Sequence, residues 1–231
     1  RGSHQGIGGA VTPLTIGSLF SGIGGLEGGL ERSGLGRVVW QCEIDPFCRK
    51  VLRKHWPDAT IYEDVRSVGH GAARVDVLCG GFPCQGLSTA NVNGRGLDDD
   101  RSGLWREYAR IVASIAPRVV VVENVGAAWR EWLPVVRRDL WRLGYASVPL
   151  RVSPAQLGAP HHRDRIFVVA YANTDGERVR AIHAKTSSLL ENPGRLGGAW
   201  RHPFAGPVRV DDGLPRRMGE VRGYGNAVVP Q

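Results

Sequence analysis

The feature that most constrains this chain is a regular alternation of short apolar runs with amphipathic stretches between residues 14 and 172. Strand-like runs are expected at 14–20, 37–43, 60–62, 75–79, 118–122, 145–152 and 165–171. Apolar residues recur at helical spacing at 24–33, 46–56, 102–115 and 131–143. Because alternating strands and helices build mainly parallel sheets covered on both faces, we predict an α/β fold with a Rossmann-like, doubly wound sheet.

The pattern breaks after this region. Residues 172–220 are rich in Gly, Arg, Asn and Pro with little periodicity, so we expect a small, irregular second lobe of basic character. A disordered segment is the alternative for this composition. Residues 221–231 regain a strand-like run and are expected to return to the first domain, 14–171. The first thirteen residues begin with Arg-Gly-Ser-His, which resembles the remnant of an expression tag. We do not use them to predict the fold.

The formal net charge of +8 favours a polyanionic partner such as nucleic acid, although solubility alone is the alternative reading. Nine basic residues fall within residues 176–222, including Arg195 and Arg201. No apolar run is long enough to span a membrane. The four cysteines form no CxxC pair and the histidines complete no zinc pattern, so we expect no metal and a reducing compartment.

A glycine-rich segment joins the first expected strand to the first expected helix, where doubly wound folds bind nucleotides: Phe20, Ser21, Gly22, Ile23, Gly24 and Gly25. It departs from the dinucleotide fingerprint, because the position of the third glycine is occupied by Glu27. A carboxylate there would repel a pyrophosphate but not a cationic ligand. The loop therefore favours a cation over a dinucleotide.

Two acids follow the next two strands. Glu43 lies about twenty residues after the loop, the usual place for a carboxylate that accepts ribose hydroxyls. Asp64 could accept a hydrogen bond from an adenine amino group. Each alone could be a solvated strand-end acid, but together with the loop they favour a binding site.

Cys84 follows the fourth expected strand and Gly80-Gly81, beyond the carboxyl edge where ligands of such sheets bind. Pro83 fixes the backbone directly before it. Glu123-Asn124-Val125 ends the next strand at the same edge. A thiol and a carboxyl that converge indicate nucleophilic catalysis with acid assistance, against the alternative of a strand-end cap. The other cysteines, Cys42, Cys48 and Cys79, are expected to be buried core side chains.

Arg163 and Arg165 are two positions apart where the chain enters its last expected strand. Residues at this spacing in a strand lie on the same face of the sheet. They could hold the active-site carboxylate or a phosphate.

In this order the motifs resemble the cytosine-5 DNA methyltransferase family, over residues 14–171 and 221–230. The resemblance implies a class I methyltransferase fold and S-adenosyl-L-methionine as cofactor, with S-adenosylhomocysteine as product. The implied cofactor-binding residues are Phe20, Ser21, Gly22, Ile23, Gly24, Gly25, Glu43, Ile44, Asp64, Val65, Pro83, Leu104, Asn226 and Val228.

The resemblance also implies the chemistry. The Cys84 thiolate would attack carbon 6 of a flipped-out cytosine, and protonated Glu123 would hydrogen-bond ring N3. Arg165 would contact the base carbonyl, with Arg163 supporting the site. The Gln156…Arg163-x-Arg165 element matches a family motif. The implied substrate-binding residues are Gln85, Ser88, Asn124, Arg195 and Arg201.

We therefore expect a compact methyltransferase of the phage or restriction–modification type. Its partner would be double-stranded DNA, and the short segment 172–220 would be its recognition region. We expect a monomer that is located in the cytoplasm, at the nucleoid. Three rivals remain open. An RNA (tRNA) cytosine-5 methyltransferase would share the architecture. A catalytically silent regulator is disfavoured by the intact Cys84, Glu123 and Arg165, and a nicotinamide oxidoreductase by Glu27 and the Pro-Cys-Gln segment.

Overall fold

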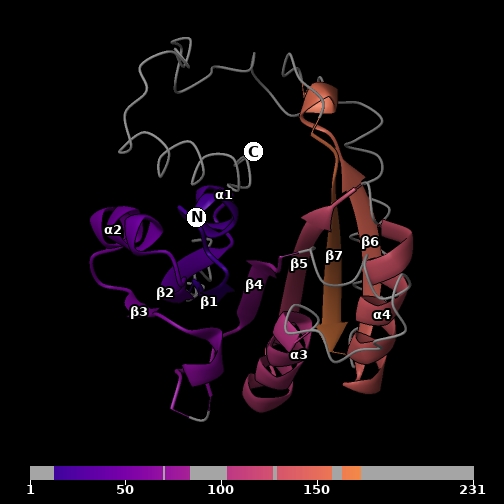
Figure 1. Ribbon diagram of the computed structural model, residues 1–231, viewed down its shortest axis with the longest axis horizontal. Coiled ribbons are helices and arrows are strands. Elements are labelled where there is room, and N and C mark those ends of the chain that lie inside the picture. Colours follow the sequence, from indigo (N-terminus) through magenta and orange to yellow (C-terminus); the bar gives the residue numbers. More distant parts are fainter. Residues whose placement is uncertain (1–12, 70, 84–102, 127–128, 158–162, 173–231) are drawn as a thin grey trace, which may run out of the picture.

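Seven strands form one sheet, in the order β3-β2-β1-β4-β5-β7-β6 (Figure 1). The computed structural model describes residues 13–69, 71–83, 103–126, 129–157 and 163–172. The strands are β1 (Leu14–Leu19), β2 (Gly36–Cys42), β3 (Thr60–Tyr62), β4 (Val77–Gly81), β5 (Val119–Val125), β6 (Tyr145–Val152) and β7 (Arg165–Ala172). The helices are α1 (Gly25–Arg32), α2 (Pro46–His55), α3 (Gly103–Ile115) and α4 (Trp129–Arg142), with short 3-10 turns η1 (Val65–Ser67) and η3 (Pro154–Leu157).

The sheet is parallel from β3 through β5, and only β7 runs antiparallel to its neighbours β5 and β6. The strand order reverses beside β1, which pairs with β2 on one side and with β4 on the other. In such sheets a reversal opens a crevice at the carboxyl ends of the two strands that flank it. The predicted mainly parallel, doubly wound α/β fold is confirmed.

Helices cover both faces of the sheet. On one face, α3 and α4 bury their apolar sides against β4, β5 and β7 in the larger core, which contains Trp105, Tyr108, Ile111, Trp132 and Val136. On the other face, Leu26 and Leu30 of α1 pack against a smaller cluster of Ile16, Val38, Val77, Cys79 and Val121. Because each face buries its own apolar set, alternate residues of the central strands point into different layers.

A β-bulge interrupts this alternation in β2. Ile16 pairs with Val38, but Gly17 pairs with Trp40, so that Val39 is an extra residue. An extra residue in a strand makes the side chains of the residues after it point to the opposite faces of the sheet. Trp40 therefore joins the larger core, where Gly17 leaves it room, since a Cβ on Gly17 would lie 2.2 Å from the Trp40 ring. Gln41 is turned to the α1 face as a result.

Strand bounds differ from expectation mainly in β4, which was expected at 75–79 and is observed at Val77–Gly81. Its two glycines belong to the strand because they lie against close neighbours: a Cβ on Gly80 would come within 2.3 Å of the Leu19 carbonyl oxygen. The apolar run expected at 118–122 lies in β5, which ends at Val125, as expected for Glu123-Asn124-Val125. The expected lobe at 172–220 and the segment 221–231 lie outside the described residues, except Ala172.

Within the described ranges, no helix is long and apolar enough to cross a membrane. Nor do three or more His, Cys, Asp or Glu side chains gather there in a way that could hold a metal ion.

Candidate active site

The carboxyl ends of β1, β2, β4 and β5 meet at one edge of the sheet because these strands are parallel. The glycine loop follows β1, Glu43 follows β2 and Phe82 follows β4. Glu123 lies near the end of β5, paired with Gly81. The fold thus brings the predicted cofactor loop and the predicted acid to a common edge.

The loop after β1 is held in left-handed backbone conformations. Phe20, Gly22 and Gly24 have φ angles of 54°, 56° and 88°. Gly24 caps α1, and a Cβ there would lie 2.2 Å from the Trp56 ring. Phe20 adopts its conformation without being glycine, while its ring stacks on Tyr108 with centroids 6.5 Å apart. Strain of this kind is uncommon and gathers at ligand sites, which supports a binding role for the loop.

Glu43 fastens this loop to the end of β2. Its Oε2 accepts the Gly22 backbone N–H at 2.7 Å, and its Oε1 accepts the Asp45 N–H at 2.8 Å. Each carboxylate oxygen has a further lone pair, so the pair could still accept two hydroxyl donors. The geometry is compatible with the predicted ribose contact.

The predicted cofactor residues Ile44, Asp64 and Val65 differ in exposure. Ile44 is 71% exposed. Asp64 caps η1 by accepting the Arg66 N–H at 2.9 Å and forms an ion pair with the Arg66 guanidinium, and these bonds lower the pKa of its carboxyl. Val65 has its side chain buried in the larger core.

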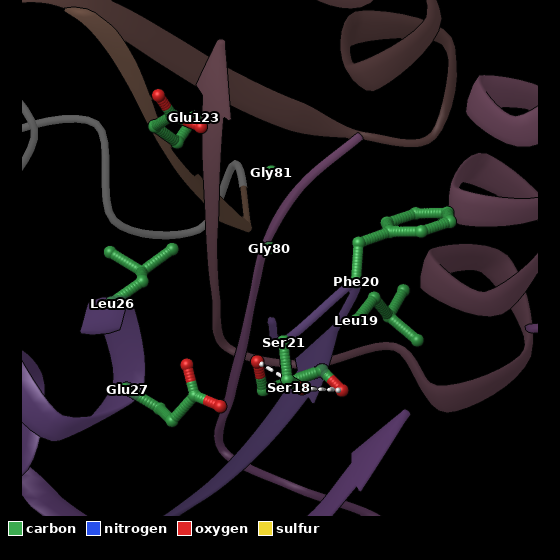
Figure 2. A pocket seen from close by; sticks show the side chains of 9 residues that line it. All are labelled: Ser18, Leu19, Phe20, Ser21, Leu26, Glu27, Gly80, Gly81 and Glu123. Carbon is green, nitrogen blue, oxygen red and sulfur yellow. Dashed lines mark hydrogen bonds between the residues drawn. The ribbon is translucent and has the colours of Figure 1, made fainter. Parts of the chain in front are cut away.

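A small pocket opens between the loop, α1 and the ends of β4 and β5 (Figure 2). Its described lining consists of Ser18, Leu19, Phe20, Ser21, Leu26, Glu27, Gly80, Gly81 and Glu123. None of these side chains is basic and two are carboxylic acids, so the pocket suits a cation and disfavours a phosphate. This donor set fits the sulfonium end of S-adenosylmethionine better than a dinucleotide.

Glu27 is fully buried at one end of this pocket. Its Oε1 accepts a hydrogen bond from Gln41 Nε2 at 2.8 Å, while no described atom makes a hydrogen bond of regular geometry to its Oε2. Burial raises the pKa of this carboxyl to about 7, although hydrogen bonds from its own backbone N–H and from the Gln41, Ser18 and Ser21 side chains partly offset the increase. Glu27 is therefore protonated at mildly acidic pH and ionises near neutrality.

Glu27→Gln is expected to make the free energy of unfolding less dependent on pH. The Glu27 pKa is about 7 in the folded protein against a reference value of 4.5, so its protonated form favours folding below about pH 4.5, and this contribution is lost as pH rises through about 7. Between these two pH limits, the contribution of Glu27 to the free energy of unfolding changes by roughly 3 kcal/mol. Urea unfolding from about pH 5 to about pH 8 measures it, with Glu107→Gln on α3 as the control. A constant gap between the variant and the parent over this range would contradict the raised pKa.

Glu123 is 7% exposed and forms an ion pair with Arg165, whose Nε lies 2.7 Å from Oε1. Its Oε2 fills the space beside Gly81, where a Cβ would approach it to 2.4 Å. Burial raises the pKa of the carboxyl, and the charges of Arg165 and Arg163 offset part of this increase. Of the two ligands expected for these arginines, a carboxylate or a phosphate, the structure shows the carboxylate for Arg165, and the charge of Arg163 acts on the same acid.

Asn124 anchors the segment that leads to Cys84. Its side chain is 3% exposed; the amide Nδ2 donates to the Phe82 carbonyl at 3.0 Å, and Oδ1 accepts the Val125 N–H at 2.7 Å. Its predicted contact with the substrate stays a prediction, since both bonds are to backbone. The exposed Pro83 follows Phe82 directly. β5 thereby fixes both the acid and the start of the cysteine loop.

Several predicted site residues are not brought to the pocket by the described structure. Leu104 is partly buried against the larger core. The residues that lie outside the described ranges are Cys84, Gln85, Ser88, Arg195, Arg201, Asn226 and Val228. Cys42, Cys48 and Cys79 are buried, as predicted, and burial raises the pKa of each thiol.

The sequence pattern identified Glu27 only as a residue unfavourable to a pyrophosphate. It predicted neither the burial of Glu27 nor its contacts with Gln41 and Ser18. The available signal was Glu27 itself, a carboxyl at a position where the α1 pattern turns toward the sheet. Its partner Gln41 could not be found, because the bulge in β2 decides which face Gln41 occupies.

The chain is similar to several known proteins. Residues 14–196 match the family described as C-5 cytosine-specific DNA methylase. The Type II methyltransferase M.Eco47II of Escherichia coli is 38% identical over 167 residues, which cover 69% of this chain and 40% of that protein. The chain spans 40% to 53% of the length of three curated relatives that it matches.

Solved structures share the fold. A prophage-encoded candidate DNA modification methyltransferase (E. coli) is 28% identical with a TM-score of 0.58, covering 70% of this chain and 47% of its own. The S. pombe Dnmt2 methyltransferase is 22% identical with a TM-score of 0.61, covering 71% and 52%. The second likeness concerns the fold alone.

Proposed function

The chain belongs to the C-5 cytosine-specific DNA methylase family, and from this premise we propose that it transfers a methyl group from S-adenosyl-L-methionine to carbon 5 of cytosine in DNA. The observation that carries the proposal is the buried Glu123–Arg165 pair at the edge where the chain enters the Cys84 loop. It lies beside a pocket whose described lining holds acids and no base.

In this reaction the Cys84 thiolate attacks carbon 6 of a flipped-out cytosine, which raises the electron density at carbon 5. Glu123, whose raised pKa favours the protonated form, donates a hydrogen bond to ring N3. Arg165 holds Glu123 in place and contacts the base carbonyl, and Arg163 supports both. Bound S-adenosylmethionine supplies the methyl group. Loss of the carbon 5 proton then releases Cys84.

The cofactor is assigned to the crevice beside β1. Glu43 accepts the ribose hydroxyls, Asp64 the adenine amino group, and exposed Ile44 offers an apolar surface to the ring. Phe20 and the glycine loop face the methionine half. Val65, Pro83, Leu104, Asn226 and Val228 complete this proposed set.

The proposed partner is double-stranded DNA, with the basic segment 172–220 as the recognition lobe and 221–231 as a return to the domain 14–171. Arg195 and Arg201 would contact phosphates there, since neutralised phosphates release counterions. Gln85, Ser88 and Asn124 would act near the target base. We place the protein in the cytoplasm at the nucleoid, as a monomer.

Transfer of tritiated methyl groups tests the proposal. The full chain is incubated with labelled S-adenosylmethionine and either varied DNA duplexes or tRNA, and methylated cytosines are then mapped. We expect label at carbon 5 of cytosine in a defined duplex sequence, and none in duplexes whose cytosines already carry a 5-methyl group. Label in tRNA with none in DNA would instead establish the RNA-acting alternative, and label in neither would refute both.

A further inference from the structure

The proposed reaction uses one of the two acids that line the pocket and leaves Glu27 without a role. Figure 2 shows the Glu27 side chain extending from α1 toward Ser18 and Ser21, with Glu123 at the other end of the pocket. Glu27 is fully buried: Gln41 donates to its Oε1, the Ser18 and Ser21 hydroxyls lie close to the carboxyl, and no described atom makes a hydrogen bond of regular geometry to Oε2. A buried acid with an unused oxygen beside a ligand pocket is costly and calls for an explanation.

The elements packed around Glu27 supply polar groups but no cation within the described part of the chain. Its own helix carries Glu31, which is turned away to bond the Val38 N–H and the Trp56 ring. The groups that face Glu27 or its pocket from other elements are Ser18 of β1, Ser21 of the loop, Gln41 of β2, Cys79 of β4 and Glu123 of β5. The Cys79 thiol stays neutral, because its burial raises its pKa well above the usual value.

We propose that Glu27 senses the charge of the bound cofactor: it holds a proton in the unliganded protein and releases it to solvent when a cationic sulfonium ligand enters the pocket. The O–H bond breaks, its electrons stay on the carboxylate, and the proton leaves through the pocket. The protein thereby favours the cationic methyl donor over its neutral thioether product. This inference rests on the proposed function, since it takes S-adenosylmethionine as the ligand.

The physical basis is competition between two cations for one carboxylate. Burial places the Glu27 pKa at about 7, so modest interactions decide its charge near neutral pH. An opposite charge within a few ångströms lowers a carboxyl pKa by roughly 1–3 pH units. Binding of the sulfonium and loss of the proton are therefore linked, and each favours the other equally. S-adenosylhomocysteine lacks this charge and leaves the proton in place.

The inference predicts how affinity depends on pH. From about pH 6 to about pH 8, the ratio of the S-adenosylhomocysteine Kd to the S-adenosylmethionine Kd should rise roughly five- to tenfold. Glu27→Gln, which resembles the protonated acid in shape and charge, should make this ratio depend much less on pH. Glu107→Gln, an exchange on α3 away from the pocket, should behave as the parent.

Isothermal titration calorimetry of the full chain measures both quantities. Each ligand is titrated at about pH 6, 7 and 8 in phosphate and in Tris, whose different ionisation enthalpies report proton release. The parent should release a fraction of a proton more than Glu27→Gln when S-adenosylmethionine binds, and the two should release equal amounts when S-adenosylhomocysteine binds. The amino groups of the ligands titrate alike in parent and variant, so their contribution cancels in that comparison.

The outcomes separate this inference from the proposed function. If both ligands bind the parent at a ratio that does not change with pH and without proton release, the inference is overturned while the cofactor assignment stands. If neither ligand binds, the cofactor assignment fails and the inference with it. Should Glu27→Gln fail to fold, selective proton release by the parent still decides.

Discussion

Cys84→Ser is expected to abolish covalent capture of a duplex that contains 5-fluorocytosine, and to lower methyl transfer by at least about a thousandfold. A serine hydroxyl is not ionised near neutral pH, so it cannot replace a thiolate that attacks carbon 6. Fluorine at carbon 5 cannot leave as a proton would, and the adduct therefore persists after methyl transfer. A denaturing gel of protein incubated with the duplex and S-adenosylmethionine measures the captured fraction.

Cys48→Ser is the matched control, because Cys48 is a buried thiol of α2 that takes no part in the proposed reaction. It should capture the duplex like the parent protein. Capture by the Cys84→Ser variant at the parent's yield would show that another residue is the nucleophile.

Glu123→Gln is expected to lower kcat about 10²- to 10⁴-fold and to leave S-adenosylmethionine binding nearly unchanged. Glutamine fits the same space and can donate a hydrogen bond, but its amide is far too weak an acid to share a proton with ring N3 as charge develops on the attacked ring. The pKa of Glu123 is raised because burial outweighs the opposing charges of Arg165 and Arg163. Glu123 is therefore fully protonated, and active, at pH values well below this raised pKa. The protonated form is lost as the pH rises through the pKa, so we expect kcat to decline at alkaline pH.

Single-turnover rates across pH, together with cofactor affinity, test this role. The variant should lose the alkaline decline along with the rate, whereas a variant that had merely unfolded would also lose cofactor binding. Glu107→Gln on α3, an acid paired with Arg110 away from the site, should keep the parent's profile. A Glu123→Gln enzyme with the parent's rate would remove Glu123 from the chemistry.

Most of the fold could be predicted from the chain because its signals are local. The β-branched run at 118–122 and the helical spacing within 102–115 give β5 and α3 to within a few residues. The β4 boundary was wrong, since the strand was expected to end at Cys79, before Gly80 and Gly81. Glycine suits turns by local preference, but here both are needed within the strand, where Leu19 and Glu123 approach too closely for any side chain.

The candidate site was predictable to the same extent. Glu43, Glu123 and Arg165 follow from strand ends, because parallel strands bring their carboxyl ends together whatever their exact register. The bonds those residues make are less predictable. That Asn124 holds the Phe82 carbonyl, or that Glu43 bonds the Gly22 N–H, depends on distances between segments far apart in the chain.

The sequence by itself determined the alternation of strands and helices, the place of the glycine loop, and the acids and arginines at one edge. These depend on periodicity and on strand order, which residue types set locally. Only the tertiary structure decided that Glu27 is buried against Gln41, which follows from one extra residue, Val39, in the pairing of β2 with β1. The position of the bulge depends on the packing of Trp40 over Gly17, which is a contact between two strands. No local pattern in either strand specifies that position.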